Sequence, residues 1–125
     1  MRSIYVHFPF CESKCHYCDF YSIGAERTAE SDPLLFETAL TAECRVMASR
    51  LGPSSGPKLE TIFFGGGTPS MTPPESMARA LAPLELDRRV GPETEWTMEA
   101  NPSSVDRERL GAYRALGVNR ISMGV

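Results

Sequence analysis

The chain has 125 residues, of which 13 are Lys or Arg and 16 are Asp or Glu, so its formal net charge is −3. This length allows one small domain with a hydrophobic core, and the mixture of apolar and charged residues excludes a disordered or fibrous protein. A slightly acidic chain without clustered Lys and Arg gives no reason to expect nucleic acid as a partner. We interpret its arginine pairs, Arg88–Arg89 and Arg107/Arg109, as solvated helix ends.

The cellular compartment of the protein decides how its cysteines are used. No apolar run approaches the roughly 20 residues of a membrane-spanning helix, and the amino terminus does not have the form of a secretion signal. We therefore expect a cytoplasmic protein that does not span a membrane. In that reducing compartment, clustered cysteines bind metals or take part in chemistry more often than they form disulfides. Cys44 lies apart, within a helical pattern, and is expected to be a small buried apolar residue.

The first predicted strand is Ser3–Phe8, which is rich in β-branched and aromatic residues and is followed by Pro9. A helix is predicted from Asp32, with Pro33 in its first turn, and Gly52–Pro53 ends it. Its apolar residues at helical spacing are Leu35, Ala39, Ala42 and Val46.

Leu59–Phe64 is the second predicted strand, and it runs into the glycine-rich turn Gly65–Pro69. Thr72–Glu75 has the form of a capping box and predicts the start of a second helix. This helix carries Met77, Leu81 and Leu84.

A third strand is predicted over Glu95–Glu99, and Asn101–Pro102 ends it. Ser103 or Ser104 is the expected cap of the next helix, which stops at Gly117. That helix is expected to bury Leu110, Tyr113 and Leu116. A fourth strand is predicted over Val118–Val125.

Strands that alternate with helices at these distances predict right-handed βαβ units and a parallel sheet. The fold class is therefore α/β, as in the amino-terminal part of a parallel (βα) barrel or partial barrel. The chain stops in or just after the fourth strand, without a closing helix. We expect residues 1–125 to be the amino-terminal portion of a longer protein.

Three cysteines, Cys11, Cys15 and Cys18, have the spacing CxxxCxxC directly after the first strand. Three thiolates on one loop can hold three irons of a [4Fe–4S] cluster and leave the fourth iron open. Structural zinc is an alternative, but it needs four ligands, and only His7 and His16 are nearby candidates for the fourth. Disulfide pairing would leave one cysteine over.

Two further signals follow the next two strands. Gly65–Thr68 offers backbone N–H and C=O groups that no side chain obstructs, although a tight strand-to-helix turn would look the same. Glu99 lies at the end of the third strand, where a carboxylate can accept paired hydrogen bonds from ribose hydroxyls. Because ligands gather at the carboxyl ends of parallel strands, these features and the cysteine loop point to one pocket.

These residues resemble a known family. The runs Tyr5–Cys11, CxxxCxYCxF, Phe63–Ser70, Glu99–Pro102 and Gly117–Val125 are similar to those of radical S-adenosylmethionine proteins. Within that family, the chain resembles the branch that contains oxygen-independent coproporphyrinogen III oxidase and a related haem chaperone. The resemblance covers essentially the whole chain.

The resemblance implies roles for particular residues. Cys11, Cys15 and Cys18 would ligate a [4Fe–4S] cluster, whose open iron would bind S-adenosylmethionine. The family positions that contact this first molecule are occupied in this chain by Tyr5, Gly66 and Glu99. The positions that line a second S-adenosylmethionine site in the oxidase are occupied by Tyr17, Gly67 and Thr68. Tyr5 and Tyr17 could instead be packing aromatics.

Phe20 separates the two functions of this branch. The oxidase has a further cysteine two residues after the motif, where the chaperone branch has phenylalanine, and this chain reads Cys18-Asp19-Phe20. The resemblance therefore favours a haem chaperone that delivers haem to acceptor proteins, over decarboxylation of coproporphyrinogen III. A structural metal-binding module is a third hypothesis.

Overall fold

A computed structural model describes residues 2–11, 23–24 and 33–123, and its centre is a four-stranded parallel sheet. The strands lie side by side in the order β1 (Ser3–Phe8), β4 (Thr61–Gly66), β5 (Glu95–Ala100) and β6 (Arg120–Met123). All three pairings are parallel, with Ser3 opposite Thr61 and Thr97 opposite Arg120. The predicted α/β class and parallel sheet are confirmed.

The strand ends differ little from the prediction. β1 has the predicted bounds. β4 begins two residues after the predicted start at Leu59, and it extends beyond the predicted end at Phe64 to include Gly65 and Gly66. A second, two-stranded pair joins β2 (Phe10–Cys11) to β3 (Ile23–Gly24), and it was not predicted.

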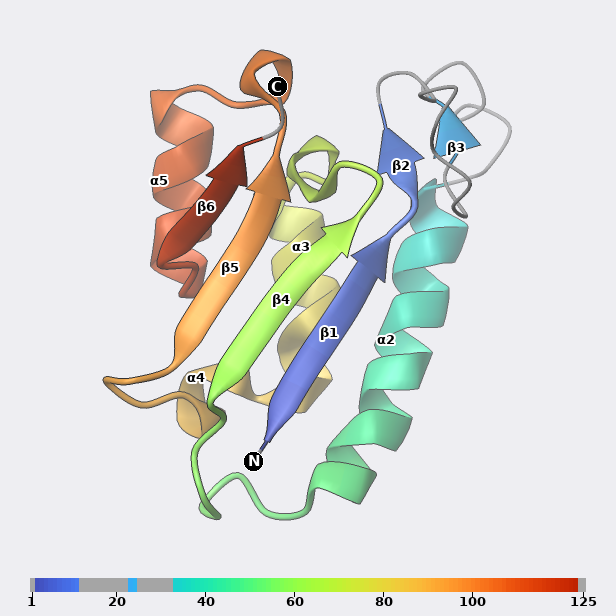
Figure 1. Ribbon diagram of the computed structural model, residues 1–125. Coiled ribbons are helices and arrows are strands. Elements are labelled where there is room, and N and C mark those ends of the chain that lie inside the picture. Colours follow the sequence, from blue (N-terminus) through green and yellow to red (C-terminus); the bar gives the residue numbers. More distant parts are fainter. Residues whose placement is uncertain (1, 12–22, 25–32, 124–125) are drawn as a thin grey trace.

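The helices cover one face of the sheet (Figure 1). They are α2 (Pro33–Leu51), α3 (Pro74–Leu81), α4 (Leu86–Arg89) and α5 (Arg107–Leu116), with short 3-10 turns η1 (Pro69–Met71), η2 (Ala82–Leu84) and η3 (Pro102–Ser104). Within the ranges that the structure describes, none of the helices is long and apolar enough to cross a membrane.

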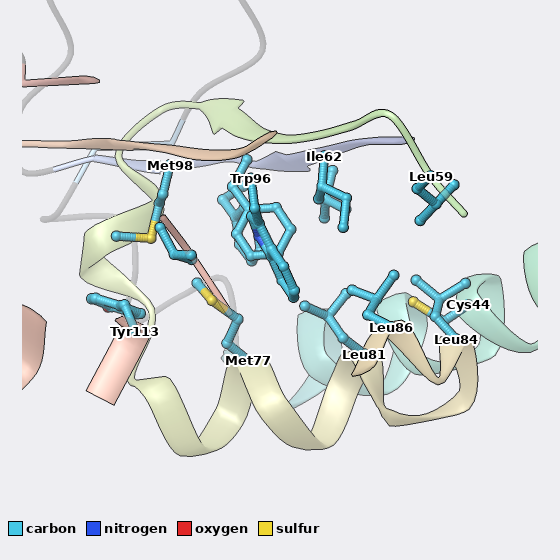
Figure 2. Close-up of a cluster of buried hydrophobic side chains, with 14 of the residues drawn as sticks. Cys44, Leu59, Ile62, Met77, Leu81, Leu84, Leu86, Trp96, Met98 and Tyr113 are labelled. Carbon is cyan, nitrogen blue, oxygen red and sulfur yellow. The ribbon is translucent and has the colours of Figure 1, made fainter. Parts of the chain in front are cut away.

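The core fills the space between the sheet and these helices. Figure 2 shows Ile62, Trp96 and Met98 pointing from the sheet toward Met77 and Leu81 of the helical layer. Because side chains alternate along a strand, β1 turns Val6 and Phe8 to this core, while Tyr5 and His7 lie on the opposite face. That opposite face belongs to the functional site described below.

The apolar residues that the sequence placed at helical spacing in α2 do not form the buried side of the helix. Leu35 and Val46 are 68% and 52% exposed, and Ala39 and Ala42 are exposed as well. The helix instead packs through the neighbouring row that includes Phe36 and Cys44, because the large Phe36 ring contacts Phe8 with centroids 6.1 Å apart. Cys44 is buried, as predicted.

Both predicted helix caps are wrong. α3 begins at Pro74 after Pro73, and the Thr72 hydroxyl has no hydrogen-bond partner among the described residues. The cap of α5 is Asp106, whose carboxylate accepts from the N–H of Arg109 at 2.8 Å. Proline at position 73 and the extra 3-10 turn η3 move each helix start beyond the serine or threonine that the sequence suggested.

Of the expected core residues of α5, Tyr113 is buried, whereas Leu110 and Leu116 are only half-buried.

Arg89 also departs from the prediction, because it is 5% exposed rather than solvated. Its guanidinium donates to the carbonyls of Leu84 at 2.7 Å and of Gly52 at 3.0 Å. Gly52 follows the last residue of α2, so Arg89 satisfies a carbonyl at the end of that helix. The neighbouring Arg88 is exposed and lies 3.8 Å from Glu85.

Arg89→Ala is expected to lower the free energy of unfolding by about 2 kcal/mol, since it leaves buried carbonyls without donors. Arg88→Ala is the matched control and should change the same quantity by less than about 0.5 kcal/mol. Urea unfolding of the full-length protein measures both. Equal effects of the two substitutions would contradict the role that we assign to Arg89.

Candidate functional site

The carboxyl ends of β1, β4 and β5 meet at one edge of the sheet (Figure 1). His7 lies opposite Gly65 and Phe8 opposite Gly66 in the β1–β4 register. The turn after β4 is anchored there, because the N–H of Gly67 donates to the carbonyl of Phe8 at 2.7 Å. The glycine-rich turn therefore starts directly beside the end of β1.

The absence of side chains at the end of β4 lets other groups approach. A Cβ atom on Gly65 would lie 2.9 Å from Oε1 of Glu99 and 3.1 Å from the ring of Tyr5. Gly66 has a φ of +109°, and its Cβ would lie 2.8 Å from the carbonyl oxygen of Phe8. Glycine is required at position 66 both by this backbone conformation and by the lack of space.

Glu99 faces the glycines from β5. Its Oε1 accepts a hydrogen bond from the backbone N–H of Gly66 at 3.2 Å. The carboxylate is therefore already paired with one donor, and carboxylate oxygens have further acceptor positions for a ligand.

Tyr5 forms the aromatic side of the same region. Its ring stacks on Phe63, with centroids 5.9 Å apart and planes inclined by 14°, and its hydroxyl lies 3.2 Å from Nδ1 of His7. Burial, together with the negative charge of Glu99, raises the pKa of the Tyr5 phenol above its usual value. Tyr5 is thus a neutral hydrogen-bonding group at physiological pH, and 57% of it remains exposed.

A cavity of about 190 Å³ lies between the turns that follow β4 and β5. Its walls are mostly polar or backbone groups from three neighbouring strand ends: Gly66, Gly67, Thr68, Glu99, Ala100, Asn101, Ser122 and Met123. Backbone donors, a hydroxyl and a carboxylate at the carboxyl ends of parallel strands suit a polar small molecule. A larger cavity of about 290 Å³ between α2 and α3 is lined mainly by apolar side chains such as Phe36 and Met77, and it belongs to the helical layer.

The structure brings five of the predicted site residues to this edge. Gly66, Gly67, Thr68 and Glu99 line the cavity, and Tyr5 approaches Gly65 beside them. Cys11 is part of β2, which follows β1 after one residue. The predictions for Cys15, Cys18 and Tyr17 lie outside the described residues.

Three residues of this region have roles that the sequence did not predict. His7 shares the face of Tyr5, and the period of two along β1 could have revealed it. Gly65 allows Glu99 and Tyr5 to approach, but its strand conformation could not be read from a glycine run. Asn101 lines the cavity although its sequence suggested only a strand end.

Fold and site together define an α/β protein with a small-molecule pocket at the carboxyl ends of parallel strands. The model of the radical SAM superfamily matches residues 5–125. The chain therefore belongs to the radical SAM superfamily, as the sequence motifs indicated.

Individual relatives are similar over nearly the whole chain. It is 37% identical to radical S-adenosyl methionine domain-containing protein 1, mitochondrial, of Mus musculus, over 98% of this chain and 26% of that protein. It is also 37% identical to the heme chaperone HemW of Bacillus subtilis, over 100% of this chain and 32% of HemW. The chain thus spans about a quarter to a third of the length of these relatives.

A solved structure gives the same fold. Coproporphyrinogen III oxidase (HemN) from Escherichia coli, described as a radical SAM enzyme, matches with a TM-score of 0.78 and 29% identity. The match covers 98% of this chain and 27% of the HemN chain. The parallel sheet with helices described above is therefore a radical SAM fold.

Proposed function

We propose that this protein binds a [4Fe–4S] cluster and S-adenosylmethionine and acts as a haem chaperone that passes haem to acceptor proteins. The observation that carries the cofactor part is the polar cavity in which Glu99 faces Gly66, Gly67 and Thr68. The relatives named heme chaperone HemW, which are 34 to 37% identical, support the haem part. Residues 1–125 are, in this proposal, the amino-terminal portion of a radical SAM core domain.

The described residues fit a nucleoside-containing ligand. Glu99 can accept hydrogen bonds from a pair of ribose hydroxyls, since a carboxylate has acceptor positions beyond the one used by Gly66. Gly66 and Gly67 line the cavity with backbone groups alone, and glycine is required at position 66 because a side chain there would meet His7 and Phe8. Tyr5 supplies a flat apolar ring and a neutral hydroxyl at the rim.

Cys11, Cys15 and Cys18 would hold the cluster through their thiolates, by the spacing of the motif. When bound, a reduced cluster of this kind supplies one electron to the sulfonium of S-adenosylmethionine. The contribution of this chain is to bind and orient the nucleoside part beside that loop. β2 contains Cys11 and follows β1 after a single residue, and this supports the arrangement.

Anaerobic reconstitution tests the cofactor part. The full-length protein, incubated with iron and sulfide, should show a sulfur-to-iron absorption band and then bind S-adenosylmethionine. Stoichiometric zinc uptake without that band would overturn the proposal in favour of a structural metal-binding module.

Coproporphyrinogen III oxidase activity is the second candidate, and the match to the HemN structure favours it. Phe20, in the place of the additional cysteine of the oxidase, supports the chaperone instead. Full-length reduced protein incubated with S-adenosylmethionine and coproporphyrinogen III distinguishes the two. Stable haem uptake without turnover supports the chaperone, and formation of protoporphyrinogen would overturn it.

The proposal includes a cytoplasmic location, as expected from the sequence. The relative from Mus musculus is named as a mitochondrial protein, so fractionation should compare both compartments. Recovery of the protein from mitochondria or from a membrane would overturn this part.

A further inference from the structure

Ser70, just beyond the glycine-rich turn, closes a ring of hydrogen bonds with the segment after β5. Its hydroxyl accepts from the N–H of Asn101 at 3.3 Å and lies 2.5 Å from the hydroxyl of Ser104. The Ser104 hydroxyl donates to the carbonyl of Asn101 at 2.9 Å. Because each hydroxyl has one hydrogen, Ser70 must donate to Ser104. The ring therefore satisfies both backbone groups of Asn101.

Tyr113 supports the same turn from α5. Its hydroxyl lies 2.6 Å from the carbonyl of Thr72 and 3.1 Å from that of Ser70, and it accepts from Nε of Arg109 at 3.2 Å. Burial raises the pKa of the Tyr113 phenol, so the group stays protonated and able to donate. Ser70 and Tyr113 are 0% and 1% exposed, so water cannot replace these bonds.

These contacts join the two walls of the cavity. Gly66 and Gly67 lie on the strand side of Ser70, and Glu99 lies two residues before Asn101. The bond between Gly66 and Glu99 also joins the walls, but both of its groups line the cavity and are open to competition by a ligand. The hydroxyls of Ser70 and Ser104 lie outside the cavity lining, so a ligand leaves their bonds in place.

We propose that Ser70, Ser104 and Tyr113 are positioning residues that hold the glycine-rich turn and Glu99 at the separation required for S-adenosylmethionine binding. This inference rests on the proposed function. The residues act through the backbone of the two turns and do not touch the ligand themselves.

The test uses the full-length protein carrying its reconstituted cluster, with S-adenosylmethionine as the probe in equilibrium dialysis. Ser70→Ala should raise the Kd about tenfold, because the loss of a buried hydrogen-bonding partner loosens the cavity wall. Tyr113→Phe, which removes only the hydroxyl, should raise it about threefold or more. Cluster content should match the wild type in both variants.

Thr72→Val is the matched control. Thr72 is buried in the same turn, and its hydroxyl has no hydrogen-bond partner among the described residues. The exchange of that hydroxyl for a methyl group should leave the Kd within about twofold of the wild type.

A Kd for Ser70→Ala equal to that of Thr72→Val would overturn the positioning role, even if the melting temperature falls. If Ser70→Ala does not fold, an unchanged Kd in Tyr113→Phe overturns it. Wild-type protein that carries the cluster but does not bind S-adenosylmethionine contradicts the proposed function itself. That outcome is visible before any variant is compared.

Discussion

Cys15→Ser is expected to abolish assembly of the proposed cluster in the full-length protein. The substitution leaves two thiolates on the loop, so a second iron of the cluster loses its protein ligand. Iron and sulfide analysis after anaerobic reconstitution, together with the sulfur-to-iron absorption band, should show a loss of more than about nine-tenths of the cluster. Cluster content at the wild-type level would show that Cys15 is not a ligand.

Cys44→Ala is the control for this experiment. Cys44 is buried in α2, and burial raises the pKa of its thiol to about 11. The thiol is therefore protonated at neutral pH, whereas iron binds the thiolate. Its removal should leave cluster content unchanged, which would separate the loss of a ligand from the loss of any cysteine.

Gly117→Ala is expected to give the largest loss of stability among the substitutions considered. Gly117 ends α5 with a φ of +133°, and a Cβ atom there would lie 2.4 Å from the Trp96 ring. Trp96 is buried at the centre of the core, so it cannot move aside without disturbing the sheet. Backbone strain and overpacking together should lower the free energy of unfolding by about 3 kcal/mol or more.

Gly111→Ala, in the same helix, is expected to raise the free energy of unfolding. Gly111 lies inside α5, and a Cβ atom there would meet nothing within 4 Å. Alanine should therefore stabilise the helix by about 0.5–1 kcal/mol. Urea unfolding of both full-length variants measures the difference. Similar effects at positions 111 and 117 would contradict the packing that we describe around Trp96.

The sheet could be predicted because apolar side chains recur at every second residue of its strands, shortly before a proline or glycine. Ser3–Phe8 and Glu95–Ala100 illustrate this, since local composition and strand period agree with the tertiary fold. Helix starts could not be predicted as well. Thr72 before α3 and Ser103 or Ser104 before α5 have the form of caps, but Pro73 and the turn η3 place the helix starts beyond them, and Asp106 caps α5 instead.

The site was predictable where its residues lie at strand ends. Glu99 and Gly66 follow from the rule that ligands gather at the carboxyl ends of parallel strands. Their direct hydrogen bond depends on the register of β4 against β5, which the sequence does not specify. Burial of Arg89 was missed because one of its carbonyl partners, Gly52, comes from a segment 37 residues away.

The order of the four strands also determines how far apart in the chain the groups that form the pocket lie. The side chains of Arg120 and Glu95, which form a hydrogen bond between β6 and β5, are 25 residues apart in the chain. The side chains of Thr61 and Ser3, which form a hydrogen bond between β4 and β1, are 58 residues apart. Closing the longer connection costs more conformational entropy, although by less than about 1 kcal/mol, because this cost grows only with the logarithm of the loop length. Tyr5 and His7 come from β1, so the aromatic side of the pocket exists only where the two ends of that longer connection are paired, with β1 beside β4.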